Sequence, residues 1–375
     1  MFNGFLQRTA EFQALELRIV DLPQRSSFQS GIGRRNSRQA LLVGWHGANG
    51  LIGYGECSCR PDPYYSAEFL DAAALLIERF VAPKLRDGLS YEELLALLGR
   101  IRGWPFTRAA VEFAFHDYLW QRDGESLFDQ YAGPRVRQVP VGISLGLQDS
   151  PQTLEQTIHE AQSKGYRRLK FKVDPDFRQA DFAACRHLLT NDRVYFDANG
   201  TLSPDDLPLL EFLTSFGNPV EQPFPPHQIE WIERAQGQLP LLRICLDEEV
   251  KGLPTLATAH RLHYLDELNL KPGRVGGLAE SLRILEYCRQ HRIPVWVGGM
   301  FETGIGRSFN LHLAALMPDA YAHDLSPSSR YFVEDLLVHP IEMNDDGLID
   351  LHQIDRTVDL ERLEKYTQKK ILLEG

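Results

Sequence analysis

The sequence predicts an α/β protein in which a modified, TIM-like (β/α) barrel carries an N-terminal α+β capping domain that the C-terminal segment completes. First, eight short apolar runs alternate with helical stretches between residues 135 and 326, as in a barrel of parallel strands. Second, residues 10–132 place strand-like runs before helical ones, which favours a separate α+β domain. Third, the 375 residues leave room for a second domain beside a barrel of about 200–250 residues.

Residues 1–134 are expected to form the capping domain. Apolar and polar residues alternate in the runs EFQALELRIV, RQALLVGWHG and GLIGYGECS, which predicts an antiparallel meander. Apolar residues then recur at helical spacing in SAEFLDAAALLIERFVAPKL and TRAAVEFAFHDYLWQRDG, with Gly or Pro near their ends. These two stretches predict helices.

Residues 135–326 are expected to form the barrel, and residues 327–375 to return to the capping domain. The predicted strands are VPVGISLG, RRLKFKV, RVYFDAN, PVEQPF, RICLDEE, ELNLKPG, PVWVGGM and YAHDLS. They are rich in Val, Ile, Leu and Phe, as are strands buried on both faces. The charged stretch ERLEKYTQKKILLEG at the end of the chain predicts a final helix.

The composition indicates which binding partners and which cellular location to expect. A net charge of −11 argues against nucleic acid, whose phosphates need clustered Lys and Arg. The chain has no apolar run long enough to span a membrane and no signal-peptide pattern at its start. Its five cysteines do not suggest a disulfide framework, so a cytoplasmic location is expected. Cys57 and Cys59 are interpreted as structural thiols rather than a metal site. A homo-oligomer is compatible with these features.

Ionisable residues recur near the ends of five consecutive predicted strands. They are Lys172, Asp197, Glu221, Asp247 and Lys271, separated by 25, 24, 26 and 24 residues. Each gap is one βα unit, so each group stands at the same height on its strand. Because the C-terminal strand ends form the mouth of a barrel, these five side chains are expected to converge on one pocket.

The three carboxylates of this set point to a bound metal ion. At separations near 5 Å and an effective dielectric near 20, they would repel one another by about 10 kcal/mol in total. Proton sharing or a bound dication can relieve this repulsion. The set contains only oxygen donors, which favours a hard cation. We expect Mg²⁺ first and Mn²⁺ second.

The lysines suggest proton transfer. Lys170 and Lys172 lie two residues apart on one predicted strand, so their side chains point the same way. Mutual repulsion, and a nearby dication, would favour a neutral amine able to act as a base. Lys271 comes from the opposite side of the ring, so two bases could face each other across a substrate. The alternative is that Lys170 and Lys172 only form salt bridges with the carboxylates.

These motifs resemble the enolase superfamily, and within it the group of o-succinylbenzoate synthases and N-succinylamino-acid racemases. The resemblance is carried by LKFKV, DANG, EQPFPP, LDEE, LNLKPGRVGG and VGGMFETGIGRS. GYGECSCRPDPYYSAE and HDLSPSSRYFVED extend it over nearly the whole chain. One departure is Gly200, which follows Asn199 where many relatives have a serine.

The resemblance implies a role for each matching residue. The metal ligands would be Asp197, Glu221 and Asp247, and the acid/base residues Lys172 and Lys271. The substrate-lining positions would be Lys170, Ser144, Asn199, Gly298, Gly299 and Met300. Lys170 would act more through its charge than as a catalyst. Glu248 would lie behind the ligands, Glu302 could support the site, and Arg274 could tune Lys271.

The expected substrate is a small-molecule carboxylate. The preferred hypothesis is Mg²⁺-dependent dehydration through α-proton removal and an enediolate, a step of menaquinone biosynthesis. The alternative is racemisation of N-succinylamino acids, alone or beside the dehydration, with dipeptide epimerisation a more distant one. A non-catalytic binding barrel and a Schiff-base lysine enzyme are the hypotheses from other classes.

Two other features remain open. The Gly-rich segment 28–39 contains three arginines, and the resemblance makes it a mobile loop over the substrate, although it could be only a solvated turn. Glu112 and His116 stand four apart on a predicted helix. They are expected to make a helix-surface or interdomain contact rather than bind a metal.

Overall fold

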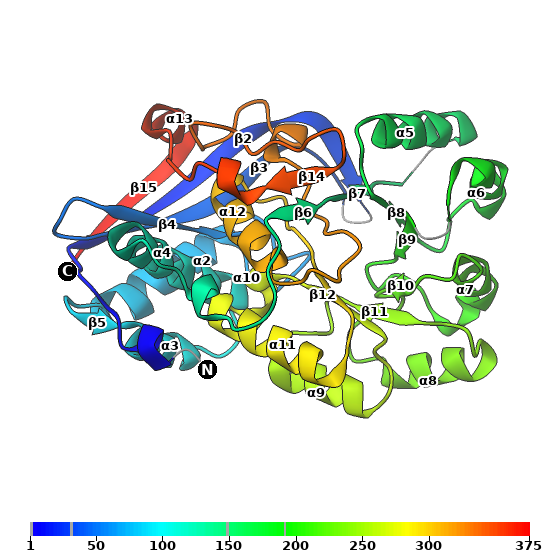
Figure 1. The fold of residues 1–375 in the computed structure, drawn as a ribbon, viewed down its shortest axis with the longest axis horizontal. Coiled ribbons are helices and arrows are strands. Elements are labelled where there is room, and N and C mark those ends of the chain that lie inside the picture. The colour runs from blue at the N-terminus through cyan, green and yellow to red at the C-terminus, as the bar shows by residue number, and fades with distance from the viewer. Residues whose placement is uncertain (1–2, 31–32, 148–149, 191–192) are drawn as a thin grey trace.

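The computed structural model describes the backbone of residues 3–30, 33–147, 150–190 and 193–375, and the side chains of these residues except 3, 26–30 and 33–35. Figure 1 shows two parts side by side: an N-terminal sheet on the left with the C-terminal strand against it, and parallel strands with outer helices on the right. No helix within these ranges is long and apolar enough to cross a membrane.

The right-hand part is built on parallel strands. In the described residues they form a seven-stranded sheet in the order β13-β12-β11-β10-β9-β8-β7. The strands are β7 (Gly142–Leu145), β8 (Arg168–Lys172), β9 (Val194–Asp197), β10 (Val220–Glu221), β11 (Ile244–Leu246), β12 (Glu267–Leu270) and β13 (Val295–Val297). All neighbouring strands pair in parallel. The predicted βα alternation is therefore present for seven strands.

The eighth predicted strand is not a strand. His323 and Asp324 make isolated parallel bridges, to Val141 beside β7 and to Gly298 beside β13. These residues thus stand between the two edge strands, but the regular ladder is interrupted there. The first predicted run is also divided. Its start is β6 (Gln138–Pro140), which pairs antiparallel with β14 (Leu348–Asp350).

Helices separate the parallel strands. They are α5 (Pro151–Ser163), α6 (Gln179–Ala184), α7 (Leu207–Thr214), α8 (Ile229–Gln238), α9 (Leu253–Arg261), α10 (Pro272–Val275), α11 (Leu278–His291) and α12 (Gly304–Ala314). Helix α5 illustrates the local signals: the Ser150 side chain caps its first turn, and Pro151 occupies the first helical position, where it costs no hydrogen bond. Leu154, Ile158 and Ala161 form its buried face.

The N-terminal sheet is antiparallel and has the order β15-β2-β3-β4 in the described residues. Strands β2 (Ala14–Ser30), β3 (Gly33–His46) and β4 (Ile52–Cys57) form the predicted meander. The predicted helices are α2 (Leu70–Leu76), continued by a π-helical turn at Ile77–Val81, and α4 (Pro105–Asp123). Smaller elements are α1 (Asn3–Leu6), β1 (Thr9–Ala10), β5 (Leu89–Ser90) and α3 (Tyr91–Gly99).

The last residues of the chain differ from the prediction. Helix α13 (Leu360–Tyr366) ends early, and strand β15 (Thr367–Glu374) follows it. β15 pairs with the open edge of β2 over most of its length, so a backbone ladder replaces the helix that the charged residues favour. The predicted return of the C-terminal segment to the N-terminal part is present as this strand.

Two glycines allow α4 to lie directly on β4. A Cβ atom on Gly53 would stand 2.3 Å from the carbonyl oxygen of Ala114, and one on Gly55 would stand 2.1 Å from that of Ala110. Both distances are far below van der Waals contact, so only glycine permits this approach.

Buried carboxylates join the two parts. Glu112 of α4 accepts a hydrogen bond of 2.8 Å from Ala279 N in the first turn of α11, where the helix presents unpaired N–H groups. Glu56 of β4 accepts bonds of 3.1 Å from Thr303 N and Gly306 N at the start of α12. Glu112 and His116 are both buried. Glu112 thus makes a contact between the two parts, as expected, whereas His116 accepts from Leu127 N.

Replacing Gly55 by alanine should destabilise the protein by about 2 kcal/mol, because the added methyl group forces α4 away from β4. The matched control is Gly99→Ala at the end of α3, where nothing lies within 4 Å of an added Cβ and a gain of up to about 1 kcal/mol is expected. Urea unfolding measures both changes. Equal stabilities of the two variants would contradict the packing described here.

Burial raises the pKa of the Glu112 carboxyl to about 7, so the free energy of unfolding should depend on pH through this group. A carboxyl with a raised pKa binds more protons in the folded than in the unfolded state, so its contribution to stability is lost as the pH rises from about 4.3 through 7. Glu112→Gln removes this loss. The stability of the variant relative to wild type should therefore increase by at least ~1 kcal/mol between pH 5 and pH 8, and an unchanged difference would count against the raised pKa.

Candidate active site

The five ionisable residues lie at one end of the parallel sheet. Lys172, Asp197 and Glu221 are the last residues of β8, β9 and β10, and they are paired in register. Asp247 and Lys271 directly follow β11 and β12. The three carboxylate residues are fully buried. Their register and spacing bring these groups to one end of the strands, as the sequence interval predicts.

Each carboxylate is paired with an ammonium group. Lys172 Nζ lies 2.6 Å from Asp197 Oδ2, and Lys271 Nζ lies 2.7 Å from Asp247 Oδ2. Lys170 Nζ lies 2.8 Å from Glu221 Oε2. The two candidate bases therefore approach the same cluster from β8 and β12, on either side of the carboxylates.

The charges act on one another strongly in this buried place. Burial would raise the pKa of Asp197, but the ammonium groups of Lys172 and Lys170 outweigh it and hold that pKa far below its ordinary value. Burial also opposes ionisation of Asp247, whose pKa is nevertheless lowered by Arg274 and Lys271. Burial and the neighbouring charge of Asp197 raise the pKa of Glu221 to about 8. Glu221 is thus the carboxyl of the three whose ionisation is opposed most by its surroundings.

Lys170 differs from the prediction that repulsion from Lys172 would favour its neutral form. Burial lowers the pKa of Lys170, but the carboxylates of Asp324 and Glu221 more than compensate and raise it well above its usual value. The alternative expectation, salt bridges from Lys170 to the carboxylates, is present as the ion pair with Glu221, and Asp324 adds a further partner that the sequence did not indicate. Lys170 is therefore a fixed positive charge, which agrees with the electrostatic role implied by the resemblance.

Two amide side chains hold the acidic residues in place. Asn269 Nδ2 donates to Glu221 Oε1 at 2.7 Å. A Cβ atom on Gly298 would stand 2.2 Å from Asn269 Oδ1, so this glycine leaves room for the amide. Asn199 accepts from Lys172 Nζ at 2.5 Å and donates to Glu248 Oε1 at 3.0 Å. Its left-handed backbone, with φ of 46°, lets its N–H donate to Asp197 Oδ1 at 3.0 Å.

A side chain from the N-terminal part reaches into the site. Tyr65, in the segment between β4 and α2, donates from its hydroxyl to Glu248 Oε1 at 3.1 Å and contacts the guanidinium of Arg274. Arg274 also donates to Asp247, the carboxylate that pairs with Lys271. Asp197, Glu221 and Asp247 are called the triad from here on. Glu248 lies behind this triad, between Asn199 and Tyr65.

The remaining predicted lining residues surround this cluster less closely. Ser144 of β7 stands in register with Lys170. Gly299 lies against the guanidinium of Arg307: a Cβ atom on this glycine would stand 2.5 Å from Arg307 Nη1. Met300 N donates to Glu302 Oε1 at 2.8 Å. Glu302 therefore supports the backbone of this segment from behind.

The segment 28–39 is not a loop over its described residues. The backbone pairs as a hairpin, with Phe28 opposite Arg35 and Ser30 opposite Gly33. The described part of the chain does not include residues 31–32 or the side chains of residues 26–35. The expectation that this segment closes over the substrate therefore falls partly outside the described residues.

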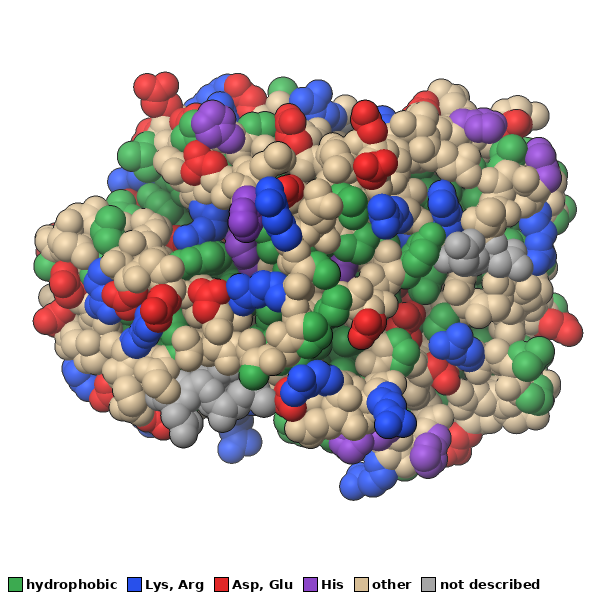
Figure 2. Space-filling model, in the orientation of Figure 1, with side chains coloured by type: hydrophobic (Ala, Val, Ile, Leu, Met, Phe, Trp, Pro, Cys, Tyr) green, Lys and Arg blue, Asp and Glu red, His purple; other side chains and the backbone are tan. Residues whose placement is uncertain are grey.

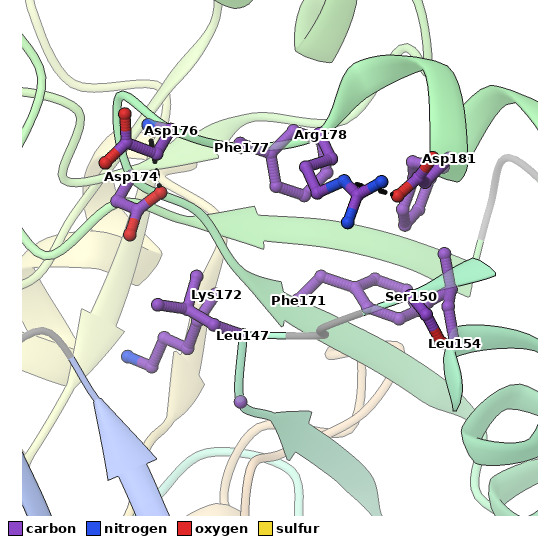
Figure 3. Close-up of a pocket in the computed structure, with 12 residues that line it drawn as sticks. Leu147, Ser150, Leu154, Phe171, Lys172, Asp174, Asp176, Phe177, Arg178 and Asp181 are labelled. Atoms are coloured by element: carbon purple, nitrogen blue, oxygen red, sulfur yellow. Dashed lines mark hydrogen bonds and ion pairs between the residues drawn. The ribbon is translucent and has the colours of Figure 1, made fainter. Parts of the chain in front are cut away.

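A cavity of about 170 Å³ opens beside Lys172, between the ends of β7 and β8. Figure 3 shows the Lys172 side chain at one end of this cavity and the Arg178–Asp181 pair at the other. Phe171 and Leu154 line the apolar wall.

The face of the molecule in Figure 2 has interspersed acidic and basic side chains and no continuous basic patch.

The donor set fits a hard divalent cation. Asp197, Glu221 and Asp247 offer only carboxylate oxygens from successive strands, and a dication would relieve the repulsion among these buried carboxylates. Among the described residues, no three His, Cys, Asp or Glu side chains already stand in a ligand arrangement. Here each carboxylate is paired with a lysine instead.

Sequence reasoning missed three residues of the cluster. Asn269 lies two residues before Lys271 on the same strand, so the two-residue alternation of strands could have identified it. Asp324 lies in the eighth predicted strand, 53 residues after Lys271, which is close to two βα units, but the predicted seventh strand between them supplies no ionisable residue to continue the series. Tyr65 comes from a distant segment, and the sequence carries no signal for its place.

Comparison with known proteins gives consistent results. Residues 153–353 match the family described as Enolase C-terminal domain-like. The chain is 34% identical to an o-succinylbenzoate synthase of Listeria innocua, over 96% of this chain and 98% of that one. It is 35% identical to an N-succinylamino acid racemase of Thermus thermophilus, over 89% and 90% of the two chains. A solved enolase superfamily member from Listeria innocua superposes with a TM-score of 0.87 at 31% identity, over 97% and 99% of the chains.

Proposed function

This chain belongs to the enolase superfamily, and from that premise we propose that it is an o-succinylbenzoate synthase. The relatives that support this include synthases from Listeria innocua and Enterococcus faecalis, each 34% identical to this chain. The single observation that carries the proposal is the placement of Lys172 and Lys271, each ion-paired with a carboxylate of one buried triad. Such an arrangement suits removal of a proton from a carbon next to a carboxylate.

We infer the architecture from the same kinship. The seven parallel strands, with residues 323 and 324 bridging their edges, would be a modified (β/α) barrel over residues 135–326. Residues 1–134 and 327–375 would form the capping domain, joined by the pairing of β15 with β2.

Asp197, Glu221 and Asp247 would hold Mg²⁺, with Mn²⁺ as the second candidate. When bound, the ion supplies a Lewis acid that stabilises negative charge on the substrate carboxylate. The three buried carboxylates, which offer oxygen donors alone, support this assignment. Asn269 and Asn199 would keep Glu221 and Asp197 in place for it.

Lys172 would move the proton. Its amine, in the neutral form, takes the α-proton of a succinyl-hydroxycyclohexadiene carboxylate, and the C–H electron pair moves toward the carboxylate, which becomes an enediolate. As the C–O bond then breaks, this electron pair forms the new C=C bond of the ring. The departing hydroxide takes the proton from Lys172 and leaves as water, so the amine is restored. Lys271, from the other side, stabilises the negative charge developing on the carboxylate. Formation of an aromatic ring drives the elimination.

The second candidate is racemisation of N-succinylamino acids, which the relative from Thermus thermophilus supports. In that reaction Lys271 would act as the second base and return a proton on the opposite face. Arg274 binds the same carboxylate as Lys271, so it is placed to influence how strongly Asp247 holds that lysine.

Mg²⁺ should stabilise the wild-type protein against urea by about 2.7 kcal/mol at one hundred times its dissociation constant. Glu221→Gln removes one ligand charge and should lose most of this effect. The matched control is Asp335→Asn, a buried carboxylate that caps α12 and lies outside the cluster, and it should respond as wild type does. A wild-type protein insensitive to Mg²⁺ would contradict the metal assignment.

Steady-state kinetics on both candidate substrates test the reaction. The wild type should dehydrate the succinyl-hydroxycyclohexadiene carboxylate, and Lys172→Ala should lower kcat by about 10²–10⁴-fold through loss of the general base. Lys164→Ala, at an exposed position, is the control and should leave kcat unchanged. Turnover of N-succinylamino acids alone would replace this proposal with the racemase.

Exchange of the substrate α-proton in D₂O separates the enzyme from a binding barrel, which would show none. Borohydride trapping of a covalent adduct would instead indicate a Schiff-base lysine.

A further inference from the structure

A column of alternating charges runs through the interior of the parallel sheet beneath the triad. Arg168 Nη2 lies 2.7 Å from Asp324 Oδ1, and Asp324 Oδ2 lies 2.7 Å from Lys170 Nζ. Lys170 then reaches Glu221 at 2.8 Å and Asp197 at 3.2 Å. All of these residues are buried, with Arg168 only 1% exposed. The column therefore links the base of the sheet to two proposed metal ligands.

Asp324 is fixed from below. The Arg168 guanidinium lies 3.8 Å from the centre of the Trp296 ring and 4.8 Å from that of Tyr195, so it is held between aromatic faces. The backbone of Asp324 is bridged to Gly298, and its N–H donates to Val297 O at 3.0 Å. Asp324 is thus a rigid carboxylate with one oxygen directed to each cation.

Lys170 contacts two of the three proposed metal ligands, Glu221 and Asp197. An ammonium has three N–H donors, and here three carboxylates surround it. Two of them are proposed ligands, so Lys170 and a dication would compete for the same oxygens. The third, Asp324, pairs with Arg168 and is the only one of the three outside the proposed ligand set.

We propose that Asp324 is a positioning residue that holds the Lys170 ammonium at the base of the cluster, and so weakens the competition of Lys170 with a divalent cation for Glu221 and Asp197. This inference rests on the proposed metal site. With Asp324 neutral, Lys170 would have only the ligand carboxylates as counter-charges and would bind them more tightly. Arg168 is needed because it keeps Asp324 oriented toward Lys170.

Isothermal titration calorimetry with MgCl₂ tests this without a substrate. Asp324→Asn preserves shape and removes the charge, and it should weaken Mg²⁺ binding by about tenfold or more, within the range of coupling energies between contacting residues. Lys170→Gln should bind Mg²⁺ at least as tightly as wild type, because the competing ammonium is gone.

The double variant decides how Asp324 acts. If it acts through Lys170, then Lys170→Gln/Asp324→Asn should bind Mg²⁺ within about threefold of Lys170→Gln alone, since nothing remains for Asp324 to hold. A double variant as weak as Asp324→Asn would overturn the proposal. If Asp324→Asn does not fold, the double variant alone still tests it: weaker binding than wild type would contradict the proposal, and equal or tighter binding would support it.

Two controls separate this inference from the proposed function. Asp335→Asn also loses a buried carboxylate, and its Mg²⁺ affinity should equal that of wild type. If wild type itself binds no Mg²⁺, the proposed metal site is wrong. If wild type and Asp324→Asn bind Mg²⁺ equally, the metal site stands and the role of Asp324 is refuted.

Discussion

The structure depends on burying three carboxylates from successive strands at one end of a parallel sheet. Asp197, Glu221 and Asp247 are fully removed from solvent, and a buried charge without a counter-charge costs several kcal/mol. Lys170, Lys172 and Lys271 supply the counter-charges from the two flanks of the triad. The three lysines that offset the cost of burying the carboxylates include the two that would carry out the proposed proton transfer. Stability and function therefore depend on one set of side chains.

The N-terminal part is tied to this cluster by carboxylates of its own. Glu56 and Glu112 accept hydrogen bonds from the first turns of α12 and α11, which fixes two helices that follow strands of the site. Tyr65 extends from the same part to Glu248 and Arg274. The environment of Lys271 is therefore set from both parts of the chain, since Arg274 and Lys271 share Asp247.

The sequence predicted the five ionisable groups because a βα unit repeats them at nearly constant intervals, and a repeat is visible without a structure. It also predicted the N-terminal meander and eight parallel strands, of which seven are present in the described residues. It could not predict β15, because the helix-favouring residues 367–374 become a strand only when the open edge of β2 pairs with them. Asp324 and Tyr65 were missed for a similar reason: their importance comes from neighbours distant in sequence. Asn269 was within reach, since it shares a strand face with Lys271.

The most direct test of the account is anomalous X-ray diffraction from crystals soaked in MnCl₂, because manganese scatters anomalously where magnesium does not. We predict one strong peak within bonding distance of carboxylate oxygens of Asp197, Glu221 and Asp247, with Lys170 still paired to Asp324. A peak elsewhere, or none at these carboxylates while they remain paired with the three lysines, would contradict the claim that this buried cluster is a metal-dependent active site.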